Sequence, residues 1–200
     1  MKQLALGISP PPQPSLDNFV PGANAELLAR LRDLHAGSSG ESIVYLWGEK
    51  GSGKSHLLRA SVRSGIHAAD DVEKLDEQAQ IELFNAINEA RQSGAAVLAA
   101  GNAPPAQLPL REDLKSRLAW GLVYQVKPLS DEERMVFLRA EAARRGMRLA
   151  DEVISYLLTR MRRDLHSLAA ILDLLDRTSL ELQRPITLPL VRAALKDADE

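Results

Sequence analysis

The chain has 200 residues, 45% of them hydrophobic, with a net charge of −2 at pH 7 and no cysteine. This length suffices for one compact core and a small appendage. The missing cysteine excludes disulfides and thiolate metal sites, and the acidic balance argues against a chain that mainly wraps nucleic acid. No apolar run approaches the ~20 residues that span a bilayer, so we expect a soluble, cytoplasmic protein.

A tail precedes the globular part. The proline-rich stretch from Ser9 to Pro14 is hostile to helices and separates residues 1–8 from the rest of the chain. Apolar residues then recur at helical spacing from Asn24 to Leu34, which predicts a helix there. Residues 1–14 are therefore expected to form a flexible N-terminal tail.

The most specific motif is Gly48-Glu-Lys-Gly-Ser-Gly-Lys54-Ser55, which satisfies G-x-x-x-x-G-K-[ST]. It follows the buried-strand pattern of residues 43–47 and precedes a helical pattern, as a P-loop requires. In this motif backbone N–H groups surround the phosphates, Lys54 reaches the β/γ oxygens and the Ser55 hydroxyl ligates Mg²⁺. The sequence predicts a nucleotide site made by Gly48, Gly51, Gly53, Lys54, Ser55 and His56.

A short apolar run from Ile66 ends in Asp70 and Asp71, where a P-loop protein places the acid on its Mg²⁺ side. Paired aspartates are also ordinary turn residues, so this signal is weaker than the first motif. Given the P-loop upstream, we interpret the run as the Walker B strand. Asp70 is then expected to ligate Mg²⁺ together with Ser55.

Helices and strands alternate through the rest of the first domain. A helix is expected over 76–91, with Ile81, Phe84 and Ile87 on one face and Leu83 beside them. A buried strand over 95–100 leads to Asn102, which could orient an attacking water as sensor 1 or simply form a turn. A helix over 110–118 and a strand over 123–126 complete an α/β pattern, which predicts a parallel sheet with helices on both faces.

The pattern becomes all-helical after Pro128. Ser130-Asp-Glu-Glu133 is a capping box, and further helices are expected at about 151–161, at 164–182 and after Ile186. The sequence therefore predicts a nucleotide-binding core over residues 15–128 and a C-terminal all-α lid subdomain over residues 129–200.

Four segments together resemble the DnaA branch of the AAA+ ATPases: residues 15–22, the P-loop, Leu114-Lys-Ser-Arg-Leu-Ala-Trp-Gly121 and the helical lid. The resemblance covers nearly the whole chain and implies bound ADP or ATP with Mg²⁺. It is greater to the DnaA-homologous regulators of this branch than to the initiator, because no helix-turn-helix DNA-binding domain is expected after Glu200.

Two matches carry the functional expectation. Gln3, Leu4, Leu6 and Ile8 resemble the peptide Q-L-x-L-x-φ, through which family members dock on the β sliding clamp of DNA polymerase III. Arg117 resembles the family's arginine finger, which would act in trans on ATP held by DnaA. Taken alone, these are a leucine-rich tail and a surface arginine. Together they imply negative regulation of replication initiation. The protein would then contact DNA and the nucleoid only indirectly, through the clamp.

The sequence departs from this family in two places. His166 stands at the sensor-2 position, where a neutral imidazole cannot replace a permanently charged arginine, so weak ATP turnover is expected. Between Ser64 and Asp70 one of the five usual strands is missing. An autonomous P-loop ATPase and a DnaC-type loader that acts on another protein or DNA remain alternatives, and a homodimer or higher oligomer stays open.

Overall fold

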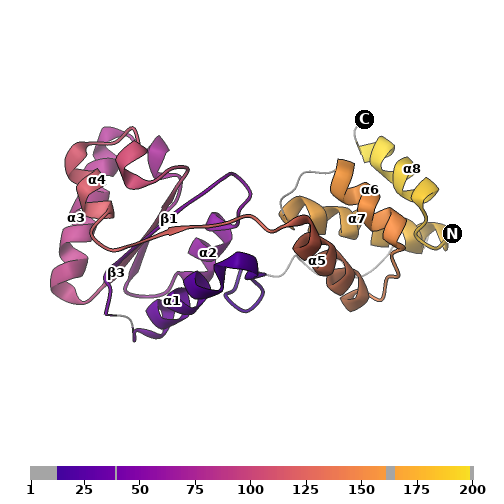
Figure 1. Ribbon diagram of the computed structural model, residues 1–200, viewed down its shortest axis with the longest axis horizontal. Coiled ribbons are helices and arrows are strands. Elements are labelled where there is room, and N and C mark those ends of the chain that lie inside the picture. The colour runs from indigo at the N-terminus through magenta and orange to yellow at the C-terminus, as the bar shows by residue number, and fades with distance from the viewer. Residues whose placement is uncertain (1–12, 39, 161–164, 199–200) are drawn as a thin grey trace. The chain divides into compact units, whose positions relative to one another are not determined.

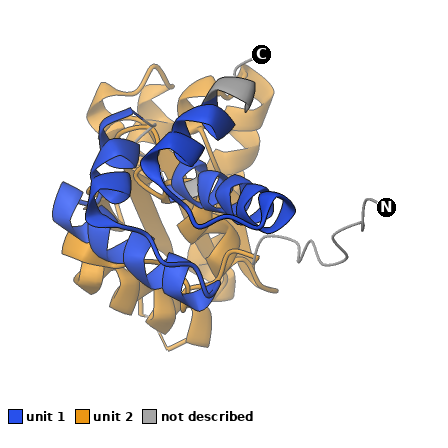
Figure 2. Ribbon diagram, turned by 90° about the vertical axis from the view of Figure 1, so that its right-hand side faces the viewer, with its two compact units in different colours: residues 1–12, 129–200 blue, residues 13–128 orange. Residues whose placement is uncertain are grey.

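The computed structural model describes residues 13–38, 40–160 and 165–198 (Figure 1). The chain divides into two compact units, Gln13–Pro128 and a helical unit that contains Leu129–Glu200, which Figure 2 colours separately. No helix in these ranges is long and apolar enough to cross a membrane.

The first unit is built on a parallel sheet of four strands: β1 (Ile43–Trp47), β2 (Ile66–Ala69), β3 (Ala96–Gly101) and β4 (Leu122–Gln125). The strand order is β2-β3-β1-β4, so β1 and β3 are central. The predicted α/β class is confirmed, and the described sheet has four strands. Since β2 follows the preceding helix after a short turn, where Ile66 N–H bonds Arg63 O at 3.1 Å, no further strand fits between them.

Helices cover both faces of this sheet. Val44 and Leu46 pack in one layer with α1 (Ala25–Ala36) and α2 (Lys54–Ser61). Ile43 and Tyr45 face the other layer, which contains α3 (Glu77–Ser93) and α4 (Glu112–Leu118). This period of two is what a strand buried on both faces requires, and it explains why β1 reads as a continuous apolar run.

Helix α3 shows one difference from the expected packing. Asp76 caps it by accepting the Ala79 N–H at 2.8 Å, and Gly94 ends it with φ 75°. The buried face consists of Leu83, Ile87 and Ala90. Ile87 was predicted on the apolar face and Leu83 beside it, whereas the burial of the small Ala90 was not predicted. The other two residues of the predicted face, Ile81 and Phe84, are left half-buried at its margin.

Three short 3-10 helices connect these elements: Gly22–Asn24, Val72–Lys74 and Pro105–Gln107. In the first of them the buried Asn24 side chain ties the start of α1 to the chain that leaves β4. Its amide donates to Lys127 O at 2.8 Å, and its carbonyl accepts the Lys127 N–H at 2.8 Å. This pair satisfies backbone groups that would otherwise be costly to bury.

The second unit contains four helices in the described residues: α5 (Asp131–Arg144), α6 (Asp151–Arg160), α7 (Leu165–Leu182) and α8 (Leu188–Ala198). The predicted capping box at the start of α5 is confirmed by reciprocal bonds between Ser130 and Glu133. The helices share a separate apolar core that includes Leu138, Leu157 and Leu172.

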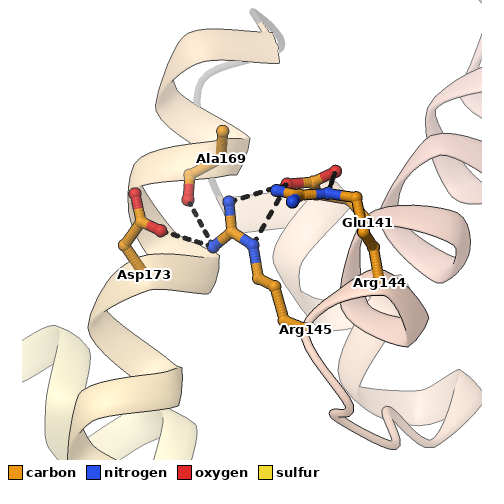
Figure 3. Close-up of polar contacts among 5 residues, drawn as sticks. All are labelled: Glu141, Arg144, Arg145, Ala169 and Asp173. Atoms are coloured by element: carbon orange, nitrogen blue, oxygen red, sulfur yellow. Dashed lines mark hydrogen bonds and ion pairs between the residues drawn. The ribbon is translucent and has the colours of Figure 1, made fainter. Parts of the chain in front are cut away.

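Arg145 joins α5 to α7 (Figure 3). Its guanidinium contacts Asp173 at 2.6 Å and Glu141 at 2.9 Å, and Arg144 contacts the same Glu141 at 2.6 Å. Arg144 first, and then Arg145, hold the pKa of the Glu141 carboxyl below its usual range, although partial burial opposes this. The two helices are thus connected by charge as well as by the apolar core.

Gly121, at the entry to β4, provides a test of how tightly β1 and β4 pack. A Cβ at this position would overlap the Ile43 carbonyl oxygen, which is backbone and cannot move aside. We expect Gly121→Ala to destabilise the protein by about 1–3 kcal/mol in urea unfolding. Gly40→Ala is the matched control, since its Cβ would meet no atom within 4 Å. Equal stability of the two variants would contradict this packing.

Candidate nucleotide site

The P-loop, residues 48–55, runs from the end of β1 into the first turn of α2. Gly51 has φ 84° and Gly53 has φ 105°, in the left-handed region that side chains rarely adopt. A Cβ on Gly53 would also lie 2.9 Å from the Phe19 ring. Glycine is therefore required here for both conformation and space, and the loop can present its N–H groups to phosphates.

The Lys54 ammonium lies over this loop. It donates to Gly48 O at 2.8 Å and to Glu49 O at 3.0 Å. Burial lowers the pKa of Lys54, while the nearby carboxylates of Asp70, Glu73 and Asp71 oppose that shift. An anionic phosphate would favour the charged form of this lysine, because it would replace the water lost on burial.

Two hydroxyl groups fit a phosphate and metal ligand. The Ser52 Oγ is buried and has no hydrogen-bond partner in the described part of the chain. Such an unpaired group costs free energy unless a ligand or water satisfies it. Ser55 is the second residue of α2, where the helix N-terminus offers N–H groups to an anion. The loop therefore fits a nucleotide phosphate.

The parallel register brings the other predicted residues to the same edge of the sheet. Trp47 and Gly101 are level, so Gly48 and Asn102 leave neighbouring strands side by side. Asp70 follows β2, whose last residue is level with Ala99 of β3. The structure thus places the P-loop, Asp70 and Asn102 together at the carboxyl edge, where ligands bind in open α/β sheets.

The paired aspartates differ in their contacts. Asp70 accepts the backbone N–H of Asp71 at 3.0 Å. Asp71 has φ 50°, and its carboxylate forms an ion pair with Lys74 at 2.6 Å. In the described residues no three His, Asp or Glu side chains form a metal cage. Mg²⁺ usually takes few protein ligands and completes its shell with phosphate and water, so the oxygen ligands of Asp70 and Ser55 would be of the right chemical kind for it.

Two residues near the P-loop were missed by the sequence analysis. Phe19 lies against Gly53 and 5.6 Å from the His56 ring, and His56 Nε2 is 3.0 Å from Ser15 O. The predicted His56 therefore holds the segment before α1 against the loop. The second residue is Glu73, whose Oε2 is buried without a hydrogen-bond partner in the described residues.

Glu73 lies close to the buried Tyr45, whose pKa is raised chiefly by burial and further by the Glu73 charge. The Tyr45 hydroxyl donates to Ala103 O at 2.8 Å, next to the loop that carries Asn102. No local sequence pattern marks Glu73, because its place depends on the 3-10 turn after β2 and on packing against β3.

Several predicted residues lie elsewhere. Arg117 is near the end of α4, and β4 begins soon after it, level with Val44 at the start of β1. It therefore lies at the amino edge of the sheet, away from the P-loop. His166 belongs to α7, and its side chain is outside the described residues. The clamp-like residues are also outside them: Gln3, Leu4, Leu6 and Ile8.

Comparison with known proteins gives a family for this architecture. Residues 131–195 match the family model of the Hda lid domain. An uncharacterized protein of Haemophilus influenzae is 34% identical over 228 positions, which cover 97% of this chain and 98% of that protein. As the chain has only 200 residues, the relative has residues without a counterpart here.

Solved structures agree on the fold. Domain III of the Thermotoga maritima replication initiation protein DnaA has a TM-score of 0.75 and 22% identity, and the match covers 93% of this chain and 97% of that one. AMPPCP-bound DnaA from Aquifex aeolicus has a TM-score of 0.71 and 21% identity, with coverage of 82% and 65%. Because residues 131–195 match the Hda lid domain and the whole chain has the fold of these DnaA structures, the chain is an Hda-like, DnaA-homologous AAA+ protein.

Proposed function

We propose that this protein binds adenine nucleotide at its P-loop, docks on the β sliding clamp through its N-terminal tail, and presents Arg117 to DnaA. Arg117 would then stimulate hydrolysis of the ATP that DnaA holds, which would switch off replication initiation. The relation of the chain to DnaA and to the Hda lid domain supports this choice of partner.

The position of Arg117 carries the proposal. The P-loop leaves the carboxyl end of β1, whereas Arg117 precedes a strand that starts level with Val44. Four residue steps of a strand separate these edges by about 13 Å, which exceeds the reach of an arginine side chain. Arg117 is thus suited to a nucleotide on a neighbouring molecule and unsuited to its own.

Each side chain has a defined part in this function. The Arg117 guanidinium would neutralise the charge that develops on the γ-phosphate of the neighbour's ATP. The chain's own ADP or ATP would be held by the loop N–H groups and Lys54, with Mg²⁺ on Ser55 and Asp70. His166 at the sensor-2 position supports weak intrinsic turnover, so this nucleotide would act mainly as a structural ligand.

Nucleotide binding is tested by Lys54→Ala. The variant loses the ammonium that lies over the loop, so we expect at least a 10-fold weaker affinity for ADP and ATP in isothermal titration calorimetry. Lys50→Ala is the matched control, because Lys50 belongs to the same loop but is exposed. Equal affinity of Lys54→Ala and the wild type would contradict the assignment of the site.

The action on DnaA is tested by following hydrolysis of ATP preloaded on DnaA, with clamp-loaded DNA present. Arg117→Ala should reduce the stimulated rate on the order of 10³-fold, or to the intrinsic rate of DnaA. Lys115→Ala on the same helix should keep the stimulation, since Glu112 already pairs its ammonium at 2.6 Å. Rapid ATP turnover by the purified chain, unaffected by Arg117→Ala, would instead favour an autonomous ATPase.

The tail is tested by retention on immobilised β clamp. Replacing Gln3 and Leu4 together by alanine removes the hydrogen-bonding anchor and one apolar side chain, so retention should fall at least 10-fold. Lys2→Ala leaves the motif intact and serves as the control. Equal retention of the double variant and the wild type would discard the clamp assignment.

A further inference from the structure

Arg117 is held by aromatic rings. Its guanidinium carbon lies 3.5 Å from the centroid of the Trp120 ring and 5.2 Å from that of Phe84. Both distances are within the ~6 Å over which a cation is attracted to an aromatic face. Trp120 is 46% exposed and Phe84 half-buried, so this contact is not a by-product of core packing.

The backbone fixes this arrangement. The Trp120 N–H donates to Arg117 O at 3.1 Å, so the ring follows Arg117 by one turn at the end of α4. Gly121 then packs against the Ile43 carbonyl so closely that no side chain fits. The backbone at Trp120 is thus held by its own hydrogen bond and by the tight packing of the next residue. Phe84 belongs to α3, at the margin of its buried face.

The hydrogen-bonding edge of Arg117 is left open by this contact. No residue in the described ranges forms a hydrogen bond or an ion pair with its guanidinium. Two other basic residues of this segment have carboxylate partners. Arg111, at the N-cap of α4, pairs with Asp113 at 2.7 Å, and Lys115, within α4, pairs with Glu112 at 2.6 Å. Ring contact uses the flat face of a guanidinium, and its five N–H donors stay available.

A second cation strengthens the attraction for an anion. The Arg91 guanidinium carbon lies 4.5 Å from the centroid of the same Trp120 ring. Trp120 and Arg91 also line a cavity of about 380 Å³ with residues 40–43 and Gly121, where Glu41 supplies a carboxylate. An anionic group at the Trp120 ring itself would meet the positive charges of Arg117 and Arg91.

We propose that Trp120, assisted by Phe84, is a positioning residue that holds Arg117 by its flat face and leaves its N–H edge for a phosphate oxygen. The phosphate would belong to a nucleoside triphosphate bound by a neighbouring subunit, so this inference rests on the proposed function of Arg117. A carboxylate partner could also hold the arginine, but it would occupy the donors that the phosphate needs.

Kinetics separate positioning from simple contact with the partner. Trp120→Leu frees the guanidinium, so the maximal stimulated rate of ATP hydrolysis on DnaA should fall roughly 10- to 100-fold. The concentration of this protein that gives half-maximal stimulation should not change. Trp120→Phe keeps an aromatic face and should retain most of the rate. Val62→Ala, at another exposed apolar residue, is the control for surface truncation.

A second measurement does not depend on DnaA. In a Trp47→Phe background Trp120 is the only tryptophan, and Arg117→Ala should increase the quenching of its fluorescence by acrylamide. Unchanged quenching would show that the ring contact is absent in solution and would overturn the inference. Wild-type rates from Trp120→Leu would also overturn it. If the wild type fails to stimulate DnaA at all, the proposed function fails, and the quenching result alone decides whether the rings hold Arg117.

Discussion

The parallel pairing of β1 with β3 and β4 is the constraint on which both functional edges depend. The level pair Trp47 and Gly101 sets the P-loop beside Asn102, and the pair Val44 and Leu122 sets the chain after Arg117 beside the start of β1. A slip of one residue would turn every side chain of β1 to the wrong layer. The same register that places the P-loop at the carboxyl edge of the sheet therefore also places Arg117 at the opposite edge.

Arg145 and Arg117 are held in place by different kinds of contact. In the helical unit Arg145 is bound by Glu141 and Asp173, so its donors are occupied in joining α5 to α7. Arg117 instead is held through its face by Trp120. The first arrangement gives a fixed connection, whereas the second keeps hydrogen-bonding capacity for a ligand. The chemistry of the guanidinium is the same, and its neighbours decide whether its N–H donors are occupied or open.

Local signals in the sequence account for much of this structure. Three features follow from residues that are close together in the sequence: the glycines predict the P-loop, Ser130 and Glu133 predict the capping box, and the apolar run before Asp70 predicts a strand. The structure forms the loop, the cap and the strand at these places. The buried face of α3 was predicted only in part: Ile87 and Leu83 are buried as named, Ile81 and Phe84 are half-buried, and the burial of Ala90 was missed because alanine carries little hydrophobic signal. Phe19, Glu73 and the contact of Phe84 with Arg117 were missed, since each depends on residues far apart in the chain that only the folded sheet brings together.

The edge strand β2 has a consequence for Asp70, which follows it. In the described sheet it pairs with β3 alone, and His67 and Ala68 are exposed on it, so little apolar burial supports it beyond one row of hydrogen bonds. Such an edge opens locally at a lower free energy than the central strands. Asp70 is the residue that directly follows this strand. A ligand that bound Asp70 only when β2 is paired with β3 would stabilise this edge of the sheet, so its binding and the pairing of β2 would be thermodynamically linked.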